Sequence, residues 1–457
     1  MWSIEEAFVI SDLHLAPEQG RGLFQADEQL AGFLDYLRKE FSRSHLFING
    51  DVFDFLVDQQ QETEIDPPYT VNQVGTIAEK HSQVFKALGL LASSTTHEVT
   101  ILGGNHDPEL VLPEVQRAIE HHLEQSLEQA SGACSILWLT NGEAASIEVG
   151  KLNVLIEHGD QYDSWNWVDH EALRRVVCLT SRNVSHQGVY KVSPGSRLVL
   201  NRFNPLRDQF PWLQTLQPLS ASIIPLSLEV ILPTLEGEDR WQLLKAVKEA
   251  NSFGVRSLVD NILLGVGSRS VHWANDDTER LALNEWLAVY EQEENVWGKF
   301  KVFEWLKRTI GRLRKHITTR QLKGLSERTT FFSIDSADEN YDAVTRLVSR
   351  GAGLVVHGHT HAAKAYTVNN GLYMNSGTWG QLTRLPDSGE TDEEWAVYID
   401  KLRQGQADSF PRLTFVHIKK ESSGTSAKLC QWTDQGVQVL SNWHFTGGAW
   451  EKRGTEV

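Results

Sequence analysis

Short apolar runs alternate with segments of helical periodicity through the first third of the chain. Residues 7–11, 45–48 and 99–102 are apolar runs with the length of buried strands. Between them, residues 24–41 and 74–91 carry apolar side chains at three- and four-residue spacing, which predicts helices. Strands that alternate with helices in this way predict an α/β layer whose functional site lies along one edge of the sheet.

Past residue 130 the pattern becomes mainly strand, and the strands resume after a long helical block. Asn141-Gly142 indicates a turn between the first two of these strands. The predicted strands are residues 135–139, 146–149, 152–156, 353–356 and 371–380.

The helical block favours an insertion, or cap, between two halves of one catalytic domain. After the second half, residues 386–410 are acidic and rich in turn residues, and residues 411–445 return to a strand pattern. The expected segments are 1–180 (catalytic domain, first part), 181–345 (helical insertion), 346–385 (catalytic domain, second part) and 386–457 (acidic loop and strands).

Two stretches of the expected insertion have an unusual composition. Residues 296–325 combine an apolar helical face with many Lys and Arg residues. Such a helix can lie on an anionic membrane, face nucleic-acid phosphates, or pack on the domain core with a solvated charged face. Residues 203–235 are rich in Pro, Trp and Leu, which suits an apolar lid, a lipid groove or the buried core of the insertion.

Composition narrows the function classes. The chain has 457 residues with 43 basic and 60 acidic side chains and a net charge of −17, which argues against a general nucleic-acid coat protein. Its three cysteines are too few and too scattered for a disulfide framework, which favours a reducing compartment. Glu5 and Glu6 stand where a secretory signal would be basic, and no apolar run is long enough to span a membrane. We therefore expect a cytoplasmic protein, with peripheral membrane contact through residues 296–325 as an open alternative.

Potential metal ligands follow the ends of five predicted strands. Carboxylate, amide and imidazole ligands without thiolate suit Mn²⁺, Fe or Zn²⁺ rather than a structural cysteine zinc site. The set has more ligands than one ion needs beside a water, whereas two ions about 3.5–4 Å apart that share a carboxylate would use them all. The residues are Asp12, His14, Asp51, Asn105, His158, His359 and His361, with His106 to spare.

These residues stand in motifs that resemble those of the calcineurin-like metallophosphoesterase superfamily. The motifs occur in the order of that family, each after an apolar strand, and they span residues 7–160 and 353–380. The resemblance implies a four-layer α/β/β/α sandwich, here with a large helical insertion that would cover the site. The motifs are Asp12-x-His14, Gly50-Asp51-x-x-Asp54, Gly104-Asn105-His106-Asp107, His158 and Gly358-His359-x-His361.

The resemblance also implies a role for each motif residue. Two divalent ions are expected, Mn²⁺ first with Fe or Zn²⁺ as alternatives, and a hydroxide shared by the ions would attack the phosphorus. His106 would stabilise the phosphoryl oxygen or protonate the leaving group, with Asp107 orienting it, whereas Asp54 and His357 would support the site. The implied ligands are Asp12, His14 and His361 for one metal, Asn105, His158 and His359 for the other, and Asp51 as the bridge.

The substrate is predicted only as a phosphodiester or a pyrophosphate, lipid-linked or nucleotide-linked. The sequences around His158 and His359 are similar to the bacterial UDP-2,3-diacylglucosamine pyrophosphatases. Those enzymes carry Arg where this chain has His106, and their cap is smaller, which indicates a relative of that enzyme. A nuclease or cyclic-nucleotide phosphodiesterase is the main alternative, although net acidity disfavours nucleic acid as a partner. A non-catalytic docking protein that keeps the metal site is the second alternative.

Overall fold

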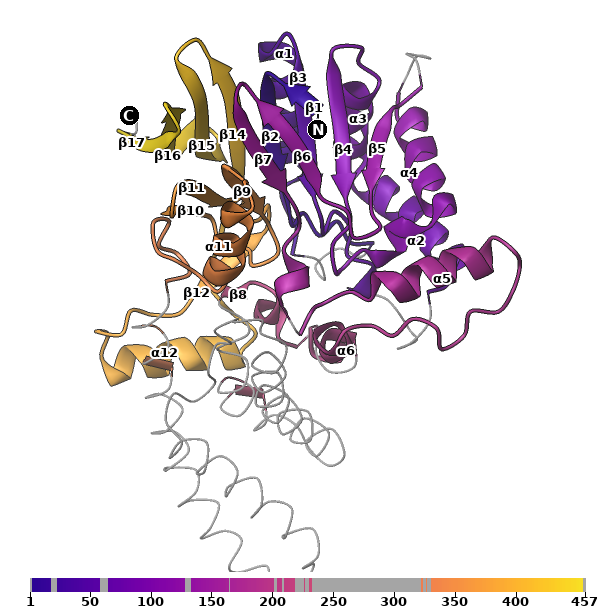
Figure 1. Cartoon of the computed structure of the whole chain (residues 1–457). Coiled ribbons are helices and arrows are strands. Elements are labelled where there is room, and N and C mark those ends of the chain that lie inside the picture. Colours follow the sequence, from indigo (N-terminus) through magenta and orange to yellow (C-terminus); the bar gives the residue numbers. More distant parts are fainter. Residues whose placement is uncertain are drawn as a thin grey trace, which may run out of the picture. The chain divides into compact units, whose positions relative to one another are not determined.

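A computed structural model describes most of the two parts expected to form the catalytic domain (Figure 1). The described residues are 2–17, 23–57, 65–127, 133–163, 165–200, 204–207, 209–217, 226, 230–231, 322–323, 326 and 330–454. Apart from residues 322–323, the expected basic helix 296–325 lies outside them. The chain divides into two compact units. The first comprises Met1–Asn204, Thr330–Leu382 and Phe410–Val457, and the second comprises Pro205–Thr329 and Thr383–Ser409.

An eight-stranded sheet forms the centre of the first unit, in the order β17-β16-β15-β14-β2-β3-β4-β5. Strands β2 to β5 are parallel, so their carboxyl ends meet at one edge of the sheet. The strands are β2 (Glu6–Ile10), β3 (Ser44–Asn49), β4 (His97–Leu102), β5 (Ile136–Leu139), β14 (Thr414–Glu421), β15 (Gly424–Thr433), β16 (Gly436–Thr446) and β17 (Ala449–Arg453).

A six-stranded sheet lies against this one, in the order β1-β6-β7-β9-β11-β10. The chain crosses from one sheet to the other at the turn containing Gly142, because β5 belongs to the first sheet and β6 to the second. Its strands are β1 (Trp2–Ile4), β6 (Ala145–Val149), β7 (Leu152–Ile156), β9 (Leu354–His357), β10 (Lys364–Val368) and β11 (Gly371–Asn375).

Alternation along β2 shows why this strand is apolar at residues 7–10. Phe8 and Ile10 pack into the cluster shared with the helices, whereas Ala7 and Val9 pack into the cluster between the two sheets. A strand covered on both faces must be apolar at every position, because successive side chains point to opposite faces. The uninterrupted apolar run at residues 7–10 is the sequence signature of this burial.

Helices cover the outer faces of both sheets, which completes the predicted four-layer α/β/β/α arrangement (Figure 1). The eight-stranded sheet is covered by α1 (Asp27–Glu40), α2 (Pro67–Lys80), α3 (Ser82–Ala92) and α4 (Pro113–Gln125). Val344 of α11 (Tyr341–Ser349) packs on the six-stranded sheet beside Val355 and Tyr373. The other helices of this unit are α5 (His170–Thr180), α6 (Pro194–Leu198), and the short 3-10 helices η1 (Phe55–Val57), η2 (Pro108–Val111) and η3 (Asp160–Tyr162).

The stretch predicted as one helix over residues 74–91 is two helices that meet at His81. Asp66 caps the first of them by accepting a hydrogen bond from the Tyr69 N–H, and Pro67 follows at the first helical position. The His81 ring lies 2.7 Å from the Asp27 carboxylate, so a contact with another helix holds the break.

The region after residue 385 corrects two expectations. Residues 386–410 are not an acidic loop throughout, because α12 (Asp392–Arg403) forms there with a capping box between Thr391 and Glu394. The acidic residues that suggested a loop occupy the first turn of this helix, where they complement its dipole. Strand β14 pairs with β2, so the C-terminal strands extend the catalytic sheet.

The described part of the second unit includes a small sheet in the order β13-β12-β8. Phe210 and Trp212 are buried, and the Trp212 indole donates a hydrogen bond to the Leu402 carbonyl of α12. Most of the described apolar residues of the 203–235 stretch are buried in the same way. The remaining elements are β8 (Leu216–Gln217), β12 (Gln381–Arg384), β13 (Ser409–Pro411), η5 (Asn204–Leu206) and η6 (Pro211–Leu213). The division of the chain expected around residues 181–345 stays a prediction.

No helix among the described residues of either unit is long and apolar enough to cross a membrane.

Candidate metal centre

The predicted ligands lie in loops that follow the strands of the two facing sheets. Backbone hydrogen bonds tie the first two loops together, from the Asp12 N–H to the Gly50 carbonyl (3.1 Å) and from the His14 N–H to the Asp51 carbonyl (2.9 Å). The loops bring together residues that are far apart in the sequence, following β2 (Asp12, His14), β3 (Asp51), β4 (Asn105, His106), β7 (His158) and β9 (His359, His361).

The backbone of these loops is strained at the ligands themselves. Among the described residues, seven non-glycine residues have positive φ, and five of them are predicted ligands: Asp12, His14, Asp51, His359 and His361. Such a conformation costs about 1–3 kcal/mol for a residue with a side chain, and it persists where the surroundings enforce it. Strain concentrated at one cluster points to a function for that cluster.

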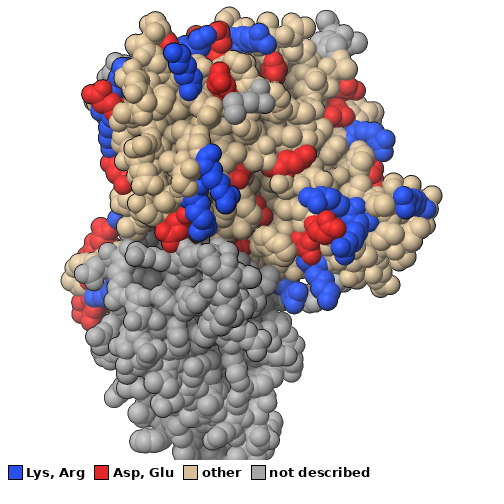
Figure 2. Space-filling view, in the orientation of Figure 1, with Lys and Arg blue, Asp and Glu red and all other residues tan. Residues whose placement is uncertain are grey.

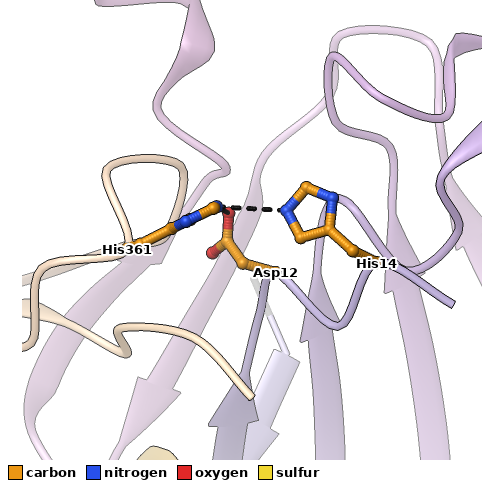
Figure 3. Close-up of side chains that lie close together, drawn as sticks. All are labelled: Asp12, His14 and His361. Carbon is orange, nitrogen blue, oxygen red and sulfur yellow. Dashed lines mark hydrogen bonds and ion pairs between the residues drawn. The ribbon is translucent and has the colours of Figure 1, made fainter. Parts of the chain in front are cut away.

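The first cluster comprises Asp12, His14 and His361 (Figure 3). The imidazoles of His14 and His361 point toward one another, with their Nε2 atoms 3.1 Å apart. The Asp12 Oδ1 atom lies 3.4 Å from the same Nε2 of His361. Two ring nitrogens and a carboxylate oxygen therefore face one point, and the three side chains come from two loops.

The second cluster comprises Asp51, His158 and His359, with Asn105 beside them. The Asp51 Oδ2 atom lies 3.4 Å from Nε2 of His158, and the Asn105 Oδ1 atom lies 2.9 Å from Nδ1 of His359. The Nε2 atom of His158 is buried and has no hydrogen-bond partner. A buried imidazole nitrogen that faces a carboxylate at 3.4 Å is a candidate metal-binding atom.

Asp51 of the second cluster also faces His14 of the first cluster through the same oxygen atom. Its Oδ2 lies 3.4 Å from His158 Nε2 and 3.8 Å from His14 Nε2, while its Oδ1 accepts a hydrogen bond from the His106 N–H (2.8 Å). A Cβ at Gly104 would overlap the Asp51 carboxylate, so glycine is required there for the loop to approach so closely. The Asp51 carboxylate therefore faces histidines of both clusters.

The ligand separations fit divalent cations. Metal bonds to nitrogen and oxygen of about 2.1 Å place neighbouring ligands about 3.0 Å apart at right angles and about 3.4 Å apart in a tetrahedron. The separations given above run from 2.9 Å to 3.8 Å, and the ligand atoms within each cluster all lie within 4.8 Å of one another. Oxygen and nitrogen donors without thiolate complete a donor set suited to Mn²⁺, Fe or Zn²⁺.

The protonation states of Asp51 and His14 favour metal binding. Against the effect of burial, however, the carboxylates of Asp51 and Asp163 raise the pKa of His158 and of His359, so these two rings must give up a proton to bind a metal. Burial alone would raise the pKa of Asp51, but the neighbouring histidines, His158 foremost, hold that pKa well below its ordinary value. Burial, followed by repulsion from His106, lowers the pKa of His14 to about 4. At neutral pH, Asp51 is therefore an anion and His14 is a neutral imidazole, which are the forms that coordinate metals.

A further set of polar contacts orients the ligands. The Nδ1 atom of His158 donates to the Asn49 carbonyl (2.8 Å), which leaves Nε2 directed at Asp51. Carboxylates also contact two histidines of the 357–361 segment. Asp163 Oδ2 lies 3.1 Å from Nε2 of His359, and Glu157 Oε1 lies 3.0 Å from Nε2 of His357. Such partners fix the ring orientation and the tautomer of a metal-binding histidine.

The carboxylate hydrogen-bonded to the His106 ring is that of Asp54 rather than of the expected Asp107. Asp107, predicted to orient His106, accepts hydrogen bonds from the backbone N–H groups of Gly104 (2.7 Å) and Val52 (2.7 Å), so it holds the β3 and β4 loops together. Asp54 lies instead at Nδ1 of His106, 3.1 Å away. Adjacency in the sequence suggested Asp107, but the backbone turns its side chain toward the loops.

Sequence reasoning missed Asp163 and did not assign Glu157 to His357. Asp163 lies only five residues after His158, at the end of η3, so the acidic character of this loop was a usable signal. The pairing was not visible, because the histidine held by Asp163 is 196 residues away along the chain.

Comparison with known families agrees with this geometry. Residues 7–212 match the family model for calcineurin-like phosphoesterases. The chain carries a calcineurin-like phosphoesterase domain. It is accordingly a metal-dependent phosphoester hydrolase, and the His/Asp clusters described above are where it can bind metal.

Two other comparisons add no detail to this phosphoesterase. A solved structure from Streptococcus pneumoniae TIGR4, described as a conserved uncharacterized protein and predicted phosphoesterase, shares 9% identity with this chain. The match covers 99% of each chain at a TM-score of 0.24, too low to carry weight. No curated protein matches the chain.

Charges of both signs are mixed on the face of the phosphoesterase shown in Figure 2. Among the described residues, small groups of Lys and Arg lie beside Asp and Glu. The ion pairs of Arg174 and Arg175 with Glu171 are an example on α5. This part of the surface does not form the continuous basic stripe typical of nucleic-acid binding.

Proposed function

We propose that the chain is a two-metal phosphohydrolase that cleaves a phosphodiester or pyrophosphate bond. The position of Asp51 Oδ2, 3.4 Å from His158 and 3.8 Å from His14, is the observation that supports two ions rather than one. The proposed ions are Mn²⁺ first, with Fe or Zn²⁺ as alternatives. When bound, they supply Lewis acidity that neutralises phosphoryl oxygens and activates water.

The protein side chains have separate proposed roles around these ions. Asp12, His14 and His361 hold one ion, Asn105, His158 and His359 hold the other, and Asp51 joins the two positions.

His106 is the proposed proton donor to the leaving-group oxygen. It is one-fifth exposed, more than its neighbours, and its ring lies 4.7 Å from that of His14. The Asp54 carboxylate accepts a hydrogen bond from Nδ1 of His106, which stabilises the protonated ring. The Nε2 atom of His106 is then the one that can donate a proton to the leaving-group oxygen. Asp107 contributes indirectly, because its bonds to Gly104 and Val52 keep the His106 loop against the Asp51 loop.

The substrate is proposed as a phosphodiester or pyrophosphate without a further choice between lipid-linked and nucleotide-linked esters. The residues expected to contact a membrane, 296–325, lie almost entirely outside the described part of the chain. Cys134, Cys178 and Cys430 are unpaired thiols, which suits the proposed reducing compartment of the cytoplasm.

Hydrolysis of a chromogenic phosphodiester and of its monoester, with Mn²⁺ present and then with a chelator, tests this function. The comparison uses wild type, Asp51→Asn, and Asp35→Asn as a matched loss of one carboxylate on the surface of α1. Chelator-sensitive diester turnover that survives in Asp35→Asn and disappears in Asp51→Asn is the expected result. Turnover by Asp51→Asn at the wild-type rate would remove the bridging role from Asp51.

A further inference from the structure

We infer that Asp163 is a positioning residue that holds His359 in the tautomer needed for metal binding. Its effect should be confined to the ion held by Asn105, His158 and His359. This inference rests on the two-metal function proposed above, and it goes beyond it by naming a residue outside the family motifs.

The contact between Asp163 and His359 fixes where the imidazole carries its proton. Asp163 Oδ2 lies 3.1 Å from Nε2 of His359. An ionised carboxylate can only accept, so Nε2 must carry the hydrogen. In the neutral ring the lone pair is then on Nδ1, and Nδ1 lies 2.9 Å from Asn105 Oδ1. Two acceptor atoms at this separation repel each other unless a cation or a proton lies between them.

Asp163 is itself held in place by its own loop. Its Oδ1 accepts from the Trp165 N–H (2.9 Å), and its Oδ2 accepts from the Asn166 side chain (2.7 Å). The Trp165 carbonyl in turn accepts from the Gly195 N–H (2.7 Å), which ties this loop to the start of α6. The carboxylate therefore presents Oδ2 to His359 from a fixed position, and a bound ion need not order it.

Asp163→Asn is a sharp perturbation because both carboxylate oxygens already accept hydrogen bonds. The new side-chain amide can take two orientations. In the first, its nitrogen replaces Oδ1 and faces the Trp165 N–H. In the second, its nitrogen replaces Oδ2 and faces the Asn166 side-chain amide and the Nε2–H of His359. The second arrangement moves the imidazole proton to Nδ1, where it blocks the metal. Loss of such a partner typically weakens metal affinity about 10–100-fold.

The test measures binding of Mn²⁺ alone to the metal-free full-length protein. Isothermal titration gives the number of ions, and electron paramagnetic resonance reports whether two Mn²⁺ ions are coupled. His14→Ala leaves only the position at Asn105, His158 and His359, whereas His158→Ala leaves only the position at Asp12, His14 and His361. Asp163→Asn is then added to wild type and to each background.

We expect Asp163→Asn to weaken Mn²⁺ binding about 10–100-fold in the His14→Ala background and to leave the His158→Ala background unchanged. Asp163→Ala, which cannot place a donor against His359, tests the same prediction if the Asn variant is poorly folded. Asp35→Asn is the control, because Asp35 lies on the surface of α1, where it pairs with Arg38 and Lys39. It should leave both affinities unchanged, with thermal melting confirming the folded state of every variant.

The outcomes separate this inference from the two-metal function. One outcome is that wild type binds two coupled Mn²⁺ ions and that Asp163→Asn binds them with the same affinities. This outcome would overturn the role of Asp163 and leave the two-metal function intact. Equal weakening in both backgrounds would show a general structural role and would also overturn it. A wild-type protein that binds only one Mn²⁺ would contradict the two-metal function and, with it, this inference.

Discussion

Acidification should destabilise the first unit through one buried histidine that lies away from the metal centre. His45 on β3 is 5% exposed, stacks on Phe47 with ring centroids 4.1 Å apart, and has its Nε2 2.7 Å from the Thr100 hydroxyl. Burial lowers the pKa of His45 from 6.5 to about 4, against a smaller opposing effect of Glu98. The folded protein therefore holds this ring neutral where the unfolded chain would protonate it.

The size and sign of the effect follow from this difference in pKa. Between pH 6.5 and pH 4 the unfolded chain binds one more proton than the folded protein at His45, so stability rises with pH and falls on acidification. Integration from pH 7 to pH 4.5 gives a loss of about 2–3 kcal/mol in the free energy of unfolding. Most of that loss falls below pH 6.

Urea unfolding at a series of pH values measures the loss, with His45→Gln as the reference. Gln cannot titrate in this range and can still pair with the Thr100 hydroxyl, so the difference between the two pH profiles isolates His45. Wild type should lose about 2–3 kcal/mol more than the variant between pH 7 and pH 4.5. Parallel profiles would refute the assignment of this acid sensitivity to His45.

Two further predictions concern the core and the proposed acid. Phe33 on α1 is fully buried, with its ring 5.1 Å from that of Trp379 and 4.8 Å from that of Phe415, so Phe33→Ala should destabilise the protein by about 3–5 kcal/mol in urea unfolding. A loss under about 1 kcal/mol would mean that the site collapses around the smaller side chain. His106→Ala should lower kcat about 10²–10⁴-fold for an alkyl phosphodiester and far less for a p-nitrophenyl ester, whose leaving group needs no proton. Equal losses on both esters, or a lower Mn²⁺ content, would contradict the role of His106 as an acid.

The sequence predicted the elements whose signals are local. A candidate ligand one to two residues after an apolar run, as Asp12 and Asp51 are, is visible in a few residues because a buried strand and its loop are consecutive. The helix after Thr391 had a local signal too, since Thr391 and Glu394 have the spacing of a capping box. It was missed because its acidic first turn was weighed as loop composition.

Features that depend on distant contacts could not be predicted in the same way. The break between α2 and α3 interrupts a continuous helical periodicity and depends on the contact between His81 and Asp27. Asp54 replaces Asp107 as the partner of His106 because of how the two loops pack. Asp163 reaches His359 only after β7 and β9, which are far apart in the sequence, have paired in one sheet. In each case the deciding interaction joins parts of the chain that no local pattern connects.

The central claim is that two metal ions act together at Asp51. The most direct measurement titrates the metal-free protein with Mn²⁺ and follows bound ions and phosphodiester turnover in the same samples. Turnover should stay near zero through the first equivalent, rise with the second, and vanish in Asp51→Asn. Full turnover with one ion bound, or none with two, would contradict the account.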